Sequence, residues 1–154
     1  MSLLIDDQKL INLKFRYVEI PDKYASRFIF IRSKEDFERY KNDPRLGEAN
    51  TGWKLLDWAD FNHIYGECFK YNTNPDGTTT GNLDFIKFRD MKLKTCLKSW
   101  DIKDSNGKPV PISASSINKL HPDVAAELLN GFEKATETPP TEPTEPAEGA
   151  SIAS

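Results

Sequence analysis

The chain has 154 residues, of which 38% are hydrophobic and 29% are charged. This length fits one domain at the usual ~100–200 residues per domain, and the composition is that of a globular protein with a single core. No apolar run approaches the ~18 residues of a membrane span, and the first ten residues lack the basic region of a signal peptide. We therefore expect neither a membrane protein nor an exported one, but a protein of the cytoplasm.

The net charge of −3 is unevenly distributed along the chain. Residues 136–154 hold four glutamates and no lysine or arginine, which leaves residues 1–135 at about +1. A nearly neutral body has no broad basic field, so nucleic acid is not an expected partner. The last stretch alternates Thr, Glu and Pro without hydrophobic periodicity. We expect a single domain over residues 1–135 and a disordered tail over residues 136–154.

The first predicted structure is an antiparallel β-hairpin. Residues 11–17 alternate apolar and polar side chains, as a strand with one buried face does, and Pro21 ends this run. Residues 27–31 contain four consecutive apolar residues and predict a second strand that is buried on both faces. Ser33 then begins a helix, because Asp36 three positions later completes the outline of a capping box.

The middle of the chain gives weaker patterns. Residues 44–50 are predicted to form a loop, and residues 53–65 are predicted to form a helix. The alternation that starts at Tyr65 also permits a strand, so residues 66–72 are left unassigned. Residues 72–82 are rich in Asn, Gly and Thr and predict a loop full of turns.

The C-terminal half is predicted to be helical. Apolar residues that return to one helical face predict a helix over residues 83–100, followed by a corner in which two prolines enforce extended backbone. A short helix capped by Ser113 or Ser115 comes next, and an amphipathic helix begins at Pro122. The predicted fold class is therefore α+β: a small N-terminal antiparallel sheet, then a helical C-terminal half, then the tail.

Two loops resemble calcium-binding loops but lack the full ligand pattern. Asn72, Asn74 and Asp76 fall at the first three ligand positions of an EF-hand, yet Leu83 stands where a bidentate glutamate is needed. The loop around Asp104 fails in the same way. The two histidines and two cysteines do not have the close spacing of a zinc site. We therefore expect neither a metal nor a cofactor.

The sequence contains no recognised catalytic motif. It has no G-x-S-x-G, no glycine-rich phosphate loop and no Cys–His pair in a familiar setting, and only two histidines are present as a general base near neutral pH. Cys68 and Cys96 are interpreted mainly as reduced, buried thiols, with a single disulfide as the alternative. The lysine-rich stretch 87–108 is interpreted as a solvated helix face. These patterns predict that the protein is not an enzyme.

Three tryptophans are more than a core of this size requires. Tryptophan and other aromatic residues are favoured anchors where proteins meet, because they bury a large area with few rotatable bonds. The candidate partner-binding residues are therefore Trp53, Trp58 and Phe61.

A characteristic order of residues follows the third tryptophan. It comprises a Trp-Asp pair, a D-x-x-G-K turn, a PVP element, a serine, a short helix and a Leu-His-Pro boundary before an amphipathic helix. This order resembles the C-terminal half of small proteins encoded in the tail-morphogenesis region of tailed phages and prophages, which are described as tail assembly chaperones or tail accessory proteins. The resemblance covers residues 84–134, about a third of the chain. It is carried by Leu97, Trp100, Asp101, Asp104, Gly107, Lys108, Pro109, Pro111, Ser113, Ile117, Leu120, Pro122, Val124 and Leu128.

The resemblance implies a non-enzymatic protein that binds the tape-measure protein, the tail tube or other tail proteins in the host cytoplasm. Two alternatives stay open from the sequence: a structural component of the virion, such as a tail or connector subunit, and a host-directed binding or inhibitory protein. Formation of a homo-oligomer also stays open.

Overall fold

The computed structural model describes residues 3–137. The predicted tail begins within this range at Thr136, the last residue of the final helix, and from residue 138 onward it lies outside the described residues. The architecture is α+β, as predicted: an antiparallel N-terminal sheet followed by helices. In chain order the elements are β1 (Ile11–Ile20), β2 (Arg27–Ile31), α1 (Lys34–Tyr40), β3 (Leu46–Trp53), α2 (Trp58–Cys68), β4 (Phe69–Thr73), β5 (Thr79–Leu83), α3 (Phe85–Cys96), β6 (Leu97–Trp100), α4 (Ala114–Asn118) and α5 (Pro122–Thr136).

The main sheet has four antiparallel strands in the order β2-β1-β3-β6. The predicted hairpin of β1 and β2 is confirmed, with Tyr17 opposite Phe30. β2 lies at the edge of the sheet and none of its residues is buried, so the prediction that it is buried on both faces is wrong. An apolar run does not reveal whether a strand has one neighbour or two.

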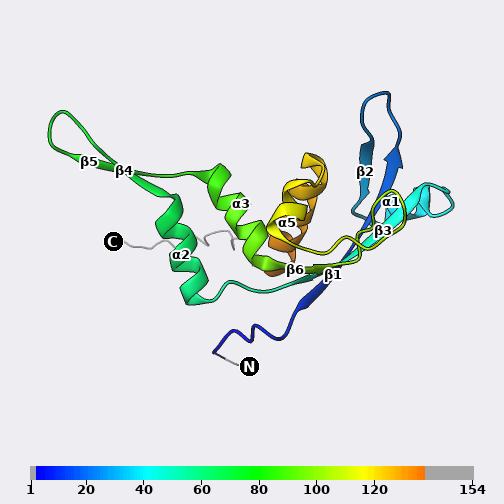
Figure 1. The fold of residues 1–154 in the computed structure, drawn as a ribbon, viewed down its shortest axis with the longest axis horizontal. Helices are drawn as coiled ribbons and strands as arrows, with labels where there is room; N and C mark the ends of the chain where they lie inside the picture. Colours follow the sequence, from blue (N-terminus) through cyan, green and yellow to red (C-terminus); the bar gives the residue numbers. More distant parts are fainter. Residues whose placement is uncertain (1–2, 138–154) are drawn as a thin grey trace, which may run out of the picture.

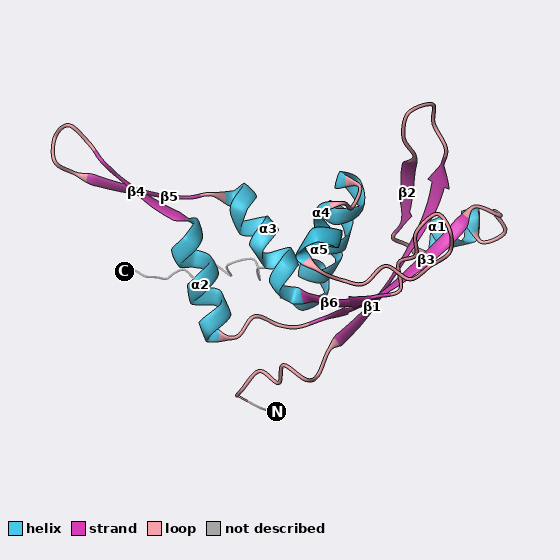
Figure 2. Ribbon diagram, viewed as in Figure 1, coloured by secondary structure: helices cyan, strands magenta, loops and turns pink. Residues whose placement is uncertain are grey.

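One face of this sheet is covered by helices, among them α3 and α5 (Figures 1 and 2). Trp53 of β3 stacks on Phe132 of α5, with ring centroids 4.6 Å apart. Phe15 of β1 lies against Gly131 of α5, where an added Cβ would come within 2.5 Å of the ring. The buried cluster that joins sheet and helices consists of Trp53, Leu93, Cys96, Leu97, Ile117, Leu128, Leu129 and Phe132.

The opposite face of the sheet is covered at one end by α1. The guanidinium of Arg16 lies 4.7 Å from the ring centroid of Phe37 in this helix, and Val18, two residues along the same face of β1, is fully buried. The predicted cap of α1 is confirmed, because Ser33 Oγ accepts a hydrogen bond from the Asp36 N–H at 3.1 Å. α1 therefore covers part of the face of β1 that is opposite to α5.

The predictions for residues 44–65 are partly wrong. The expected loop 44–50 belongs mostly to β3, and the helix begins at Trp58 rather than at residue 53. β3 contains two glycines and an asparagine, which are poor strand formers. Its conformation follows from the ladder with β1, in which Ile11 lies opposite Trp53. Local propensity cannot show such long-range pairing.

The predicted helix 83–100 is shorter than expected at both ends. Leu83 belongs to β5, and α3 ends at Cys96, where the Leu97 N–H donates the last helical hydrogen bond to Leu93. The chain then turns into β6, because the Cys96 carbonyl accepts from the Lys54 N–H at 2.8 Å and ties the strand to the end of β3. The predicted turn-rich loop 72–82 is largely a hairpin of β4 and β5.

The predicted corner after Trp100 is confirmed. Trp100 Nε1 donates to the Val110 carbonyl at 2.6 Å, which holds the indole against the extended segment. Gly107 has a φ of +78°, the left-handed position that the turn requires. Ser113 caps α4 in a reciprocal capping box, and His121 Nδ1 caps α5. These local features position the start of α5 over the sheet.

Residues 54–96, which we call the arm, leave the sheet and return to it. α2 runs outward, β4 and β5 form a hairpin with Gly77 in its turn, and α3 runs back. The hairpin forms a two-stranded sheet of its own and projects away from the rest of the molecule (Figures 1 and 2). The arm is thus an extension of the core fold rather than part of its main sheet.

Candidate protein-binding surface

Four aromatic rings form a continuous row on the arm. Trp58, Phe61 and Tyr65 stand at positions i, i+3 and i+7 of α2, which lie on one side of a helix. Ring centroids are 6.2 Å apart between Trp58 and Phe61 and 4.6 Å apart between Phe61 and Tyr65. Phe88 of α3 extends the row, with its ring edge-to-face on Tyr65 at 5.6 Å. We call these four residues the aromatic row.

The aromatic row borders the buried side of α2, because Ile64 and Cys68 follow Phe61 by three and seven residues. Ile64 and Cys68 are fully buried, and the Cys68 thiol lies 3.8 Å from the sulfur of Met91 on α3. The helix begins at a cap in which the Asp57 carboxylate accepts from the Asp60 N–H at 2.8 Å. The row therefore lies along the boundary between the buried side of α2 and solvent, and Trp58 is the most exposed of its rings.

The three candidate residues that were predicted from the sequence lie in different environments in the structure. Trp58 and Phe61 come together in the aromatic row and are exposed, Trp58 to 76% and Phe61 to 39%. Trp53 is 0% exposed in the core, and its Nε1 donates to Thr51 Oγ1 at 2.6 Å. Trp53 therefore offers no surface to a partner, and that part of the prediction is corrected.

Sequence reasoning missed other apolar residues at the surface of the arm. Tyr65, which is 37% exposed, and the half-buried Phe88 complete the aromatic row, and Tyr71, Phe85 and Ile86 lie at 69–86% exposure around the hairpin and the start of α3. For Tyr65 the spacing of four residues from Phe61 was a visible signal. The other residues had no local signal, because their exposure depends on how the arm projects.

Both acidic residues of α2 are paired with lysines of neighbouring segments. Lys54 Nζ lies 2.7 Å from Asp60 Oδ2, and Lys87 Nζ lies 3.8 Å from Glu67 Oε1. Burial alone would raise the pKa of Asp60, but the ion pair with Lys54 outweighs it, so the pKa is lowered and the carboxylate stays ionised. The two acidic residues of α2 are thus compensated, and the rings of the row offer apolar contact.

The lysines on α3 are also paired with acidic side chains. Lys92 Nζ lies 2.9 Å from Glu133 Oε2 on α5, and its side chain is mostly buried. Lys94 Nζ lies 3.0 Å from Asp90 Oδ2, one turn earlier on α3. The helix therefore carries compensated charges at these positions rather than free cations.

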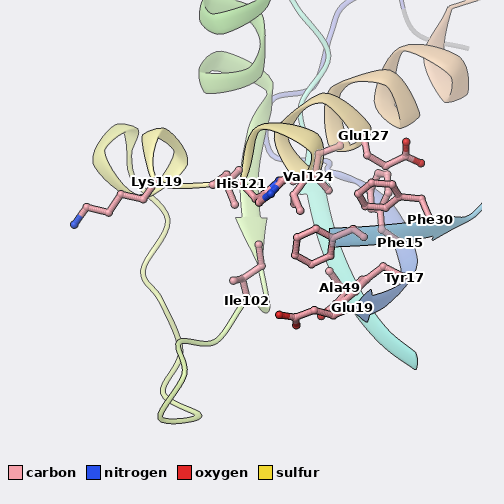
Figure 3. Close-up of a pocket in the computed structure, with 13 residues that line it drawn as sticks. Phe15, Tyr17, Glu19, Phe30, Ala49, Ile102, Lys119, His121, Val124 and Glu127 are labelled. Atoms are coloured by element: carbon pink, nitrogen blue, oxygen red, sulfur yellow. The ribbon is translucent and has the colours of Figure 1, made fainter. Parts of the chain in front are cut away.

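A cavity lies between the sheet and the start of α5 (Figure 3). It has a volume of about 270 Å³. Aromatic rings of β1 and β2 form much of its wall: Phe15, Tyr17, Phe28 and Phe30.

The polar side chains around this cavity have other roles. Lys119 points away from the cavity in Figure 3, and His121 Nδ1 is engaged as the cap of α5. Burial raises the pKa of Tyr17, which keeps its phenol protonated. The cavity can accept an apolar group.

The aspartates of the two calcium-like loops are engaged in turns. Asp76 Oδ1 accepts from the Thr78 N–H at 2.9 Å, and Asp104 Oδ1 accepts from the Asn106 N–H at 2.8 Å. Within residues 3–137, no three His, Cys, Asp or Glu side chains gather as metal ligands would. The loops are explained by their backbone geometry.

Both cysteines are buried with free thiols, as the favoured interpretation predicted. Burial raises the pKa of Cys96 to about 11, so its thiol is protonated at neutral pH. A buried, protonated thiol is a poor nucleophile and a poor metal ligand.

No family model matches the chain, and no curated protein or solved structure matches it. In the part of the chain that the structure describes, no helix has the length and apolar character to cross a membrane. The function must therefore be argued from the surface of the chain itself.

Proposed function

We propose that this chain is a non-enzymatic binding protein that holds apolar segments of other proteins through the aromatic row. The observation that carries the proposal is the distribution of exposed apolar side chains. Of the eleven large hydrophobic residues exposed within residues 3–137, seven belong to the arm. Exposed apolar surface gathered on one projecting element is typical of a site that another molecule covers.

The geometry of the aromatic row suits an apolar helix or extended segment. Aromatic side chains have few rotatable bonds, so they lose little conformational entropy when a partner covers them. Their ring-to-ring contacts, 4.6–6.2 Å between centroids, restrict them further. The ion pairs Lys54–Asp60 and Lys87–Glu67 compensate these four charges, so none of them is left unpaired when a partner covers the rings.

The specific role that we propose is that of a phage tail assembly chaperone or related morphogenesis factor. This step rests on the sequence resemblance over residues 84–134. In this role the chain would bind the tape-measure protein in the host cytoplasm and shield its apolar segments until tail-tube subunits polymerise around it. The exposed row supplies the kind of contact that such shielding needs.

The test is co-purification of the full chain with the tape-measure protein of its own genome. The double variant Trp58→Ala/Phe61→Ala should weaken binding by about tenfold or more, because a buried aromatic anchor typically contributes more than about 1 kcal/mol. His63→Ala is the matched control, since His63 is exposed on the same helix outside the aromatic row. The proposal fails if the wild-type chain does not bind, or if both variants bind equally well.

Mass spectrometry of purified particles separates the chaperone from its structural alternative. A chaperone leaves the tail once assembly is complete, so the chain should be missing from mature particles. Stoichiometric copies in the particle would instead identify a virion subunit.

A further inference from the structure

We propose that the β4–β5 hairpin pairs with the same hairpin of a second copy, strand β5 against strand β5, to form a continuous four-stranded sheet. This inference concerns self-association and does not depend on the proposed chaperone role. It rests on four features of the hairpin: its free edges, its register, its charge and its position outside the core.

Within residues 3–137, β5 pairs only with β4, so its outer edge carries backbone hydrogen-bonding groups that no described strand takes up. Within the hairpin, the Asp84 N–H donates to Cys68 at 2.9 Å and the Asn74 N–H donates to Thr78 at 2.7 Å. These bonds mark the two ends of one regular register, in which hydrogen-bonded pairs alternate with non-bonded pairs. The residues between them on β5 that point their N–H and C=O groups outward are therefore Thr79, Gly81 and Leu83.

These three residues form a self-complementary set. If a two-fold axis passes between Gly81 and Gly81 of the second copy, the two glycines make a hydrogen-bonded pair, and Thr79 pairs with Leu83 on either side. The side chains of Thr80 and Asn82 then face each other across the new ladder in non-bonded pairs, where side chains approach most closely. Antiparallel pairing about this axis uses every outward group of β5.

The charge of the two edges favours β5 over β4. β5 has the sequence TTGNL and carries no charged residue, so two copies meet without repulsion. β4 carries Lys70 at its second position, and a lysine on an edge strand is a common protection against further pairing. Pairing through β5 alone gives a closed dimer instead of an open fibre.

The position of the hairpin makes pairing both accessible and useful. It projects clear of the main sheet and of α5, so a second copy can approach its edge (Figure 2). A lone two-stranded hairpin is at best marginally stable in water, whereas a sheet of three or more strands with an apolar face can be stable. Phe69 and Tyr71 share one face of this hairpin, with ring centroids 5.1 Å apart, and the pairing places the equivalent rings of both copies on the same face.

The exposed start of α3 supplies additional apolar area. Phe85 and Ile86 follow β5 directly and are 69% and 86% exposed. In the proposed register they lie toward the hairpin turn of the second copy, around Gly77. Five paired residues with these two side chains bury less than the ~1,200–2,000 Å² of a stable interface, so we expect a weak, concentration-dependent dimer.

The experiment is sedimentation equilibrium of the full chain over a wide range of concentrations. The wild-type chain should show a reversible monomer–dimer equilibrium. The double variant Thr80→Lys/Asn82→Lys should remain monomeric, because the symmetric register sets lysine against lysine. Asn72→Lys on β4 is the control, since it adds a lysine to the hairpin away from the proposed interface and should leave dimerisation unchanged.

A charge-reversal mixture makes the test specific to this edge. Thr80→Glu/Asn82→Glu should also be monomeric alone, and mixing it with the lysine double variant should restore a dimer. Thermal unfolding of each variant checks that the exposed substitutions leave the fold intact. A wild-type chain that stays monomeric at the highest concentration overturns the proposal, as does a dimer that persists in the lysine double variant. The wild-type chain could instead stay monomeric and bind an extended segment of another protein. If the lysine double variant then lost that binding, the edge would belong to that partner and the dimer proposal would be overturned.

Discussion

At the scale of single residues, two tryptophans five positions apart have opposite environments. Trp53 is fully buried, stacked on Phe132 and bonded to Thr51, whereas Trp58 is mostly exposed. Trp53→Ala should lower the free energy of unfolding by about 3–5 kcal/mol, because it opens a large cavity and leaves the Thr51 hydroxyl without its donor. Trp58→Ala should change it by less than about 0.5 kcal/mol.

Urea unfolding followed by circular dichroism measures both changes. Equal losses of stability in the two variants would contradict the burial of Trp53 or the exposure of Trp58. The same pair also separates stability from binding, since only Trp58→Ala should affect a partner.

The sequence could not distinguish these tryptophans, for a physical reason. Trp53 is buried because β3 pairs with β1 and α5 packs across both, and these contacts join residues far apart in the chain. Trp58 and Phe61 were predictable as one face of a helix, because their spacing is a local property. Local spacing places side chains relative to one another, but it does not reveal which side of the helix meets the core.

At the scale of elements, two helical glycines have different packing. Gly131 of α5 lies against Phe15, where an added Cβ would come within 2.5 Å of the ring, while Gly66 of α2 has open space around its Cβ position. Gly131→Ala should destabilise the fold by about 1–2 kcal/mol, since overpacking outweighs the gain in helix propensity. Gly66→Ala should stabilise it by about 0.5–1 kcal/mol.

The two substitutions are chemically identical, so each is the control of the other in denaturant unfolding. A stability change of the same sign in both would mean that α5 does not pack on β1 as closely as the structure has it. The comparison therefore tests the contact that joins the last helix to the sheet.

Elements were predictable to the extent that their cause is local. The caps at Ser33 and Ser113 and the turn at Gly107 depend on neighbouring residues, and all three are confirmed. The strand β3 depends on its ladder with β1, and β6 depends on its ladder with β3. Neither strand was predicted from the sequence. The corner after Trp100 was predicted because prolines and a glycine restrict the backbone without outside help.

At the scale of the whole molecule, the fold consists of a packed core and a projecting arm. The buried cluster joins the main sheet to α5 and to the last part of α3, whereas the β4–β5 hairpin forms a separate sheet. Local openings occur at low free energy where few buried contacts oppose them, and near the global free energy in the core. The backbone amides of the hairpin should therefore exchange with deuterium far faster than those of β1 and β3.

The exchange rates of the hairpin should also depend on self-association. In the monomeric Thr80→Lys/Asn82→Lys variant, β5 should exchange rapidly at every protein concentration. In the wild-type chain the outward amides of Thr79, Gly81 and Leu83 should slow as concentration rises, because the second copy takes up their hydrogen bonds. Amides of β3 should show no such dependence, which controls for general effects of concentration. Rapid exchange of β5 in a demonstrated dimer would mean that the copies meet elsewhere, and protection of β5 equal to that of β3 in the monomer would mean that the hairpin belongs to the core.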